Sequence, residues 1–482
     1  WRTVYTVNHV GFVARQNIET REYTFITPTP ETISNFSEYV EYDYDETRNR
    51  YTIDPGEHWF FRERPDRPLL PPQFRFNWSS PFIISSNNSK RVFFGSNHLF
   101  KSDDRGDNWK IISPDLTTND KSLRNTSDGG GLTNSNTGGE NHFTIITISD
   151  TPIDKDVIWV GTDDGNVQVT KDNGDTWDNV RPNIVGVPQK TWVSRVEASK
   201  HKKGRAYVSF DNHRFDDNKP YVFMTDDYGK SWKNITSNLP KDYSVYVIKE
   251  DYIDENLLFV GTEKSVYFTI NQGKIWEKLG SNLPSVAVHD LVIHPRDGDL
   301  IAGTHGKSIW ILDDISPLRN LNFNSNKIIP SRESTKWIKI NTGRKQPYFE
   351  FRGENPPYGT IINFYSKTEI KGKINITNSS GDNLYKRDIT LNSGLNRFIW
   401  PFELDRNSDE FNNYKTKFIN LVDELKDIVI DKKNLKQYNF KNLNSFDEIN
   451  KLRKSFLDDY GMYANGKKIF GDKLYESYAV KP

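Results

Sequence analysis

The sequence predicts a mainly β protein in which a β-propeller is followed by a small β-sandwich and a helical tail. Three observations predict this fold. A turn motif that ends in Trp recurs four times before residue 280, apolar strands that end in Gly precede three of the copies, and aromatic residues make up 13% of the chain. A high aromatic content beside a hydrophobic content of only 35% suits many short strands joined by long polar loops.

Bulk composition excludes several classes of protein. A chain of 482 residues is too long for one ordinary core, so two or three domains are expected. Lys plus Arg and Asp plus Glu each number 65, and a zero net charge gives no basic field for binding nucleic acid. Cysteine is absent, which excludes disulfides and thiolate chemistry. No apolar run approaches the ~20 residues of a transmembrane helix. The chain begins inside an apparent strand, residues 3–7, so we expect a processed product or part of a longer chain.

The recurring motif has the pattern Ser/Thr-x-Asp-x-Gly-x-x-Trp, and its copies start at Ser102, Thr170, Thr225 and Thr269. The last two starts are 44 residues apart, close to the ~40–50 residues of one four-stranded blade. Longer intervals imply loop insertions, the largest from about residue 117 to 140. The structural positions of the four copies are Asp104, Gly106, Trp109; Asp172, Gly174, Trp177; Asp227, Gly229, Trp232; and Asn271, Gly273, Trp276.

The motif is interpreted first as a folding device. Its Asp side chain is expected to accept hydrogen bonds from backbone N–H groups about two residues on, which closes a turn. Its Gly supplies a positive φ, and its Trp packs beneath the hairpin. Asn271 replaces Asp in the fourth copy, where an amide oxygen still accepts such a bond.

Four such copies resemble the BNR/Asp-box β-propellers, which include sialidases, two-propeller xyloglucanases and sortilin-type receptors. The closer likeness is to bacterial secreted proteins described as sortilin-like or glycosyl-hydrolase-like BNR repeat proteins. It is carried by the Asp boxes, by Val-Gly-Thr-Asp-Asp-Gly ending at residue 165, and by the run from His289 to Leu318. The resemblance implies an N-terminally incomplete propeller of about six blades over residues 1–320. It also implies secretion or a cell-envelope location, within a larger envelope assembly, and a protein, peptide or glycan ligand.

Two further segments follow the propeller. Residues 331–405 show short strands at 361–365, 373–377, 384–391 and 395–400 separated by Ser, Gly and Asn, a pattern that predicts a small β-sandwich. The segment 394–400 resembles immunoglobulin-like modules of bacterial envelope proteins. Residues 410–482 are predicted to be a helical tail that packs on the preceding domains. Apolar residues recur at helical spacing over 418–429 and 446–460, and Ser445 with Glu448 forms a capping-box signature.

Candidate ligand residues lie where the innermost strand of each blade is expected to enter the channel. A mixture of Trp, Arg, His and carboxylate suits a sugar, an acidic peptide or a sulfated glycan. A water-filled channel also needs a polar lining whatever its function. The ligand-binding candidates are Arg75, Trp78, His142, Trp192, Arg195, Tyr246, His289 and, on a nearby loop, His305.

Catalytic chemistry has a narrower set of candidates. A glycoside hydrolase needs two carboxylates flanking the scissile bond, and the candidates are Glu140, Asp216 and Asp290. The arginine cluster of a sialidase is missing, and in the two-propeller xyloglucanases the acidic pair is split between two propellers, whereas one is predicted here. No His-Glu-x-x-His metal motif, phosphate loop or Gly-x-Ser-x-Gly elbow occurs. No cofactor or metal is therefore predicted. The Asp pairs at 103–104, 163–164, 226–227 and 313–314 leave calcium as a minor alternative, since capping of turns also explains them.

The sequence therefore favours a secreted or envelope-bound binding or scaffold propeller, without a transmembrane segment, that recognises a protein, peptide or glycan at its channel mouth. The alternative is a glycoside hydrolase that acts on a polysaccharide through a pair of carboxylates.

Overall fold

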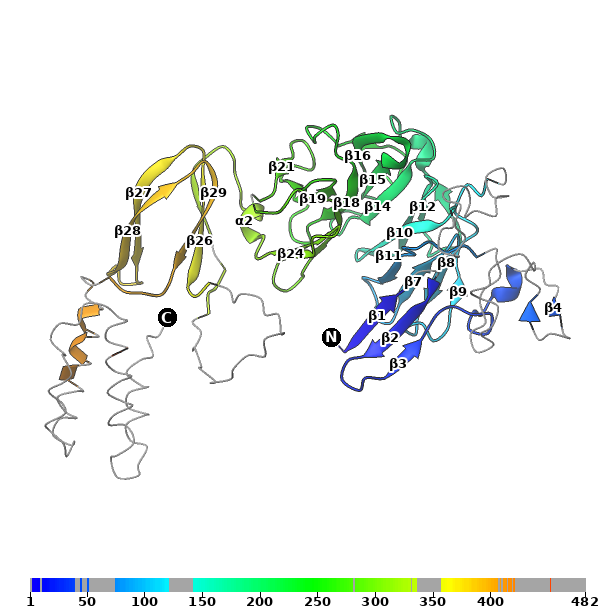
Figure 1. Ribbon diagram of the computed structural model, residues 1–482, viewed down its shortest axis with the longest axis horizontal. Coiled ribbons are helices and arrows are strands. Elements are labelled where there is room, and N and C mark those ends of the chain that lie inside the picture. Colours follow the sequence, from blue (N-terminus) through cyan, green and yellow to red (C-terminus); the bar gives the residue numbers. More distant parts are fainter. Residues whose placement is uncertain are drawn as a thin grey trace, which may run out of the picture. The chain divides into compact units, whose positions relative to one another are not determined.

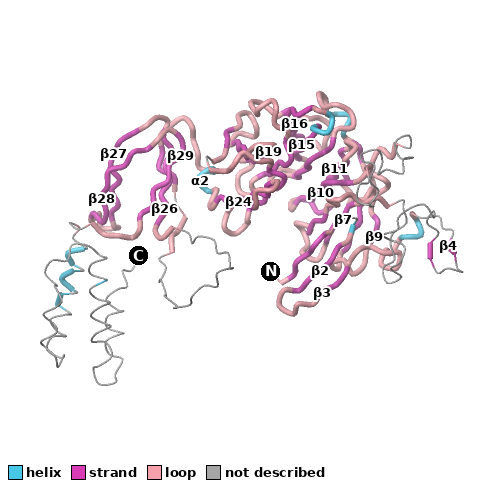
Figure 2. The backbone as a smooth tube through the Cα atoms, in the orientation of Figure 1, coloured by secondary structure: helices cyan, strands magenta, loops and turns pink. Residues whose placement is uncertain are grey.

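The fold is that of a computed structural model, which describes two compact units, Trp1–Arg319 and Asn320–Pro482 (Figure 1). Strands and loops make up most of the residues that the structure describes in both units (Figure 2). Each unit is treated by itself. The described residues are 2–8, 11–39, 44–45, 50–51, 74–120, 142–280, 282–330, 332–335, 357–405, 408, 411–413, 415–417, 419–420 and 451.

Six antiparallel sheets of three or four strands follow one another along the first unit, beside the two-stranded β4–β5 sheet, which confirms the mainly β propeller fold. Four of them have four strands and the first and last have three, as described. In chain order the strands are β1 Thr3–Val7, β2 Val13–Asn17, β3 Tyr23–Phe25; β6 Phe82–Ile84, β7 Val92–Gly95, β8 Leu99–Ser102, β9 Lys110–Ile111; β10 Ile145–Thr151, β11 Asp154–Thr162, β12 Val167–Thr170, β13 Asp178–Asn179; β14 Trp192–Ala198, β15 Ala206–Asn212, β16 Asp217–Thr225, β17 Lys233–Asn234; β18 Val245–Glu250, β19 Leu258–Thr262, β20 Val266–Thr269, β21 Glu277–Lys278; and β22 Val288–Ile293, β23 Leu300–Thr304, β24 Ile309–Leu312.

An apolar layer lies between each sheet and the next, over the first five sheets. Successive residues of one strand point to opposite faces, so a strand that is buried on both faces reads as a continuous apolar run. Ile158 and Trp159 on β11 show this, because Ile158 joins the cluster shared with the second sheet and Trp159 joins the cluster shared with the fourth. On β15, Tyr207 joins the cluster shared with the fifth sheet, and Val208 joins the cluster shared with the third. These layers stack the sheets as blades.

The Asp boxes close the turns between third and fourth strands. In the first copy the Ser102 hydroxyl donates to Asp104 Oδ1 at 2.7 Å, and the same carboxylate oxygen accepts the N–H of Asn108 at 2.9 Å. The acceptor role predicted for Asp is confirmed, but the N–H lies four residues on rather than two. Asn271 makes the equivalent bond to Ile275 N–H at 3.0 Å, so the amide does serve in the fourth copy.

Each Asp box also joins its sheet to the preceding one, which the motif did not predict. The indole N–H of Trp177 donates to the carbonyl of Ile112 at 2.9 Å, and a Cβ built on Gly174 would approach that carbonyl oxygen to 2.5 Å. Trp109 and Trp276 make the same kind of bond to Ile26 and Ile235. The recurring pattern therefore sets the contact between blades as well as the turn.

The second unit contains two small sheets, β25–β26–β29 and β27–β28. A cluster around Phe364, Ile374 and Tyr385 includes side chains of both sheets. β25 lies ahead of residue 331, where the sequence places the start of this domain, and the resemblance to immunoglobulin-like modules stays a prediction. The strands are β25 Lys327–Ile329, β26 Thr360–Ser366, β27 Ile370–Thr377, β28 Asn383–Leu391 and β29 Gly394–Trp400.

Short elements complete the description. Residues 411–413, 415–417, 419–420 and 451 are helical, and the rest of the predicted helical tail, including its apolar positions and the capping box, lies outside the described residues. The remaining elements are η2 Phe36–Glu38, β4 Tyr44–Asp45, β5 Arg50–Tyr51, η5 Arg181–Asn183, η6 His213–Phe215 and α2 Ser316–Arg319.

Candidate functional site

Antiparallel pairing brings the start of each first strand and the end of each second strand to one edge of the blades. Strands β10, β14, β18 and β22 begin at this edge, and β11, β15, β19 and β23 end there. We call it the entry edge. The Asp boxes follow the third strands, so they lie at the opposite edge of their sheets. Side chains at the entry edge come from residues far apart in sequence.

Four aromatic side chains of the last three sheets lie together at the entry edge. Tyr246 on β18 stacks on His289 of β22, with ring centroids 4.3 Å apart and an interplanar angle of 15°. His305 lies 5.4 Å beyond His289, and His213 meets Tyr246 edge-on at 6.1 Å. Tyr246 and His289 were predicted from their strand positions and His305 from its place on a nearby loop, and the structure brings the three rings together.

Two more rings extend this group toward the third sheet. Trp192, the first residue of β14, lies nearly parallel to His142 with centroids 6.4 Å apart. The Arg214 guanidinium carbon lies 3.6 Å from the Trp192 ring centroid, close enough for a cation–π contact. We call His142, Trp192, His213, Tyr246, His289 and His305 the ring row.

Carboxylates beside the ring row each have a partner. Asp211 is 4% exposed, and its oxygens accept from His213 Nδ1 at 2.7 Å and from Arg214 at 3.3 Å. The Tyr246 hydroxyl donates to Glu263. These contacts fix ring orientation, as carboxylates commonly do for imidazoles.

Asp290 and Arg195, both predicted as site residues, pair with each other across the entry edge. Arg195 is on β14 and Asp290 on β22, two sheets further along, and their nitrogen and oxygen lie 2.8 Å apart. The Arg195 side chain is 31% exposed and that of Asp290 55% exposed. The positive charge of Arg195 and the negative charge of Asp290 therefore neutralise each other where β14 and β22 begin.

The pKa values of the ring-row residues differ with their surroundings. Burial lowers the pKa of His289, and the nearby His305 lowers it further. Burial alone would lower the pKa of His142, but Asp163, 3.6 Å from its ring nitrogen, and Asp164 raise it overall. Burial and then Glu263 raise the pKa of Tyr246, which keeps its hydroxyl a donor at neutral pH.

The other predicted ligand residues lie outside the ring row. Arg75 is 7% exposed, with its guanidinium bonded to Asp115 at 2.7 Å and to the Phe143 carbonyl at 3.1 Å, so it fastens the second sheet to the start of the third. Trp78 is 47% exposed and precedes β6.

Two of the three catalytic candidates, Asp216 and Asp290, lie in the described residues. Asp216 ends η6 in the left-handed region with φ 58°, on an exposed turn. Asp290 is paired with Arg195, and Glu140 lies outside the described residues.

Sequence reasoning missed the carboxylates that hold the ring row in place. Asp163 and Glu263 each follow a Gly-Thr pair at the end of a second strand, and His305 follows the third such pair. Alignment of these Gly-Thr pairs would have placed all three residues at one edge.

Within the described residues, no group of three His, Asp or Glu side chains is arranged to hold a metal ion. Two of the Asp residues from the suggested calcium pairs have protein partners instead. Asp103 pairs with Arg91 at 2.6 Å and Asp226 with Arg205 at 2.6 Å. None of the described helices is long and apolar enough to cross a membrane.

A family model described as "Sortilin, neurotensin receptor 3" matches residues 220–401, less than half of the chain. This match confirms the predicted resemblance to sortilin-like Asp-box propellers. The matched segment runs from β16 of the first unit to the end of β29 in the second. No match is found among curated proteins.

Several solved structures are similar to this chain at low identity. An ancestral GH74 enzyme is 14% identical over 66% of this chain and 39% of its own, with a TM-score of 0.37. The GH74 xyloglucanase from Xanthomonas campestris is 15% identical over 64% of this chain and 43% of its own, with a TM-score of 0.40. YCF48 bound to D1 peptide is 21% identical over 35% of this chain and 51% of its own, with a TM-score of 0.28. The chain thus spans about two fifths of the length of the two GH74 structures, and no functional conclusion follows from likenesses at this level.

Proposed function

We propose that the chain is an extracellular or cell-envelope binding propeller that holds a peptide segment of a partner protein at the entry edge, within a larger assembly. The ring row carries this proposal. Its rings cover one another's faces and leave polar edges exposed, since the side chain of His213 is 39% exposed and that of Arg214 35% exposed. Concave, partly aromatic surfaces with a few placed polar groups are typical ligand sites.

The stacking favours a peptide over a glycan as the ligand. A sugar ring packs against an open aromatic face, but Arg214 lies over Trp192 and Tyr246 packs face to face with His289. The exposed imidazole and guanidinium N–H groups are instead suited to carbonyl and carboxylate oxygens, which a peptide supplies along its whole length.

The glycoside hydrolase alternative has weaker support. Hydrolysis needs two carboxyl groups about 5–9.5 Å apart that flank one bond. At the entry edge, Asp211, Glu263 and Asp290 each have a hydrogen-bonding or ionic partner.

Selection from a displayed random-peptide library on the immobilised chain tests the proposal, followed by isothermal titration calorimetry with the enriched peptides. We expect micromolar binding that weakens at least tenfold in His289→Ala and in Arg214→Ala, because both remove exposed donors. Tyr23→Ala serves as the control, since Tyr23 is 52% exposed on β3, outside the ring row, and its loss should leave affinity unchanged.

Three outcomes would contradict the proposal. One is a folded wild-type chain that enriches no peptide, and another is binding that neither substitution weakens. The third is release of reducing sugars from a polysaccharide that Asp290→Asn or Glu140→Gln abolishes, which would establish the hydrolase.

A further inference from the structure

Each Asp box is tied by a backbone bond to the turn that joins the first two strands of its own sheet. The residue after the Asp or Asn has a positive φ, and its N–H donates to a carbonyl in that turn or, in the second copy, near the start of the strand that follows it. The four bonds are Arg105 to Lys90 at 2.8 Å, Asn173 to Asp156 at 2.8 Å, Tyr228 to Gly204 at 2.9 Å and Gln272 to Asn256 at 3.1 Å. The four pairs therefore occupy equivalent places in four blades.

Only the first of these pairs is made of two cations. The equivalent residues in the other three copies carry no positive charge. Two cations on adjacent backbones repel each other, so a turn alone gives no reason for the combination. Among the described residues, neither the Lys90 ammonium nor the Arg105 guanidinium has an ion pair.

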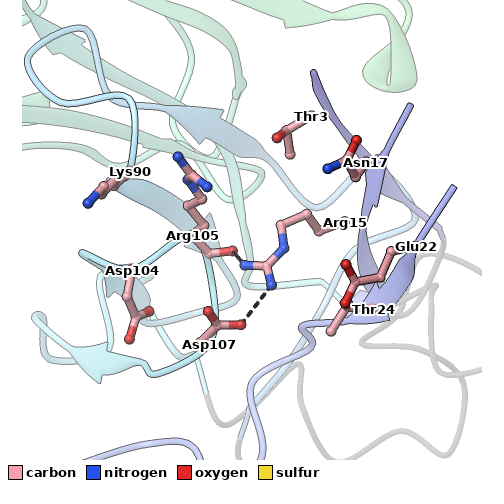
Figure 3. Close-up of a pocket in the computed structure, with 9 residues that line it drawn as sticks. All are labelled: Thr3, Arg15, Asn17, Glu22, Thr24, Lys90, Asp104, Arg105 and Asp107. Atoms are coloured by element: carbon pink, nitrogen blue, oxygen red, sulfur yellow. Dashed lines mark hydrogen bonds and ion pairs between the residues drawn. The ribbon is translucent and has the colours of Figure 1, made fainter. Parts of the chain in front are cut away.

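A cavity of about 310 Å³ adjoins this pair, between the first sheet and the first Asp box. Arg15 of β2 crosses it and donates to the Arg105 carbonyl at 3.0 Å and to Asp107 at 2.9 Å, as the dashed lines in Figure 3 show. Arg15 therefore neutralises Asp107. Asp104 is engaged by Ser102 and Asn108, which lowers its pKa although burial would raise it.

The other residues that line the cavity fall into two sets, cations and residues that can form hydrogen bonds with hydroxyl groups. Figure 3 shows Lys90 on one side of Arg15 and Glu22 with Thr24 on the other, while Thr3 and Asn17 lie next to each other above the Arg15 side chain. Glu22 and Asn17 offer hydrogen bonds to hydroxyl groups, whereas Lys90 and Arg105 offer charge to an oxyanion. The volume lies at the lower limit of small-molecule sites, roughly 300 Å³.

We propose that this cavity binds an anionic sugar, with its carboxylate or sulfate group between Lys90 and Arg105 and its hydroxyls toward Glu22 and Asn17. A single negative charge fits better than a phosphate dianion, because Glu22, Asp104 and Asp107 also line the cavity. The cavity contains an Asp box, so it lies at the edge opposite the ring row and does not depend on the peptide site.

Isothermal titration calorimetry on the full chain tests this proposal with four probes: glucuronate, glucose 6-sulfate, glucose and sodium sulfate. We expect at least one anionic sugar to bind with a millimolar or tighter Kd that weakens as NaCl is raised. Arg105→Asn and Lys90→Asn should each weaken binding at least tenfold. Both introduce residues that occupy the same places in other copies, namely Asn173 and Asn256, so the fold should be retained.

Gln272→Asn is the matched control, because it makes a similar change at the equivalent position of the fourth Asp box and should alter Kd less than twofold. The proposal is overturned if neither anionic sugar binds, if glucose binds as tightly, or if Arg105→Asn and Lys90→Asn retain wild-type affinity. Sodium sulfate that binds as tightly as glucose 6-sulfate would also overturn it, since the cavity would then be an anion site without selectivity for a sugar. The glucuronate and sulfate titrations distinguish the two anionic groups.

Discussion

The Gly of the Asp box shows how much a single residue determines, because it serves a turn and a contact between blades together. Gly174 has a φ of 106°, and an added Cβ would lie 2.5 Å from the Ile112 carbonyl oxygen. We expect Gly174→Ala to lower the free energy of unfolding by about 2–5 kcal/mol, from backbone strain and overpacking together. Gly186→Ala is the control, since Gly186 has a φ of 90° but open space around it, and should cost only about 1–2 kcal/mol. Equal losses in urea unfolding would show that contact between blades does not constrain Gly174.

At the same scale, the sequence identified which residues meet at the entry edge better than it identified their partners. Tyr246, His289 and Trp192 stand at the starts of first strands, and strand periodicity alone places such residues at one edge. The pairing of Arg195 with Asp290 was not predictable, because it spans two blades and depends on how far each sheet turns from the last. A residue pattern fixes the edge, whereas only the packed structure fixes the partner.

Individual strands are joined by buried charges as well as by apolar layers. Glu197 on β14 has a side chain only 5% exposed, and its oxygens lie 2.5 Å from the Lys200 ammonium and 2.9 Å from that of Lys249 on β18. Burial alone would raise the pKa of Glu197, but the two ammonium groups lower it to about 2. The carboxylate therefore links the first strands of two blades.

Removal of this charge should weaken the contact between β14 and β18. We expect Glu197→Gln to lower the free energy of unfolding at pH 7 by about 3 kcal/mol, because the buried carboxylate is the counter-charge of Lys200 and Lys249, whose side chains are 28% and 29% exposed. The pKa is depressed in the folded state, so the stabilisation is complete above the unfolded pKa of about 4.3 and is lost as pH falls through about 2. The difference between variant and wild type should thus narrow between pH 5 and pH 2 in urea unfolding. Exposed Glu277→Gln on β21 is the control, and a Glu197→Gln cost that does not change with pH would contradict this account.

Strands that belong to the repeat were predicted well from the sequence. Contacts between residues far apart in the chain were not predicted. The apolar segments that end in Gly ahead of three Asp boxes are confirmed as strands and lie in β7, β11 and β19. The role of the tail, the short segment that follows each Asp box, was not predicted. Asn238 in one such tail exchanges hydrogen bonds with the backbone of Trp276 in the next sheet, at 2.7 and 2.9 Å. No local pattern reveals a bond whose partners are 38 residues apart.

At the scale of the whole propeller unit, the first and last sheets differ from those between them. Figure 1 shows the six sheets in an arc with β1–β3 at one end and β22–β24 at the other. On the last sheet, Leu291 and Ala302 are buried against the fifth sheet, whereas Val292, Ile309 and Ile311 on the other face are 47–67% exposed. On the first sheet, Val4, Tyr23 and Phe25 are 44–54% exposed. Interior sheets bury both faces, so these two faces are apolar surfaces without a neighbouring blade in the described residues.

Large exposed apolar faces on sheets promote association, which gives a prediction for the isolated chain. We expect its apparent mass in sedimentation-velocity runs to rise with protein concentration. The double substitution Ile309→Thr and Ile311→Thr should reduce this rise while leaving Tm within a few degrees, because both side chains are exposed and contribute little to the core. Ile253→Thr is the control, since Ile253 is 59% exposed on a loop outside the end sheets and should not change association. A wild-type chain that stays monomeric at high concentration, or a double variant that associates as strongly as wild type, would show that the end face of β22–β24 does not drive association.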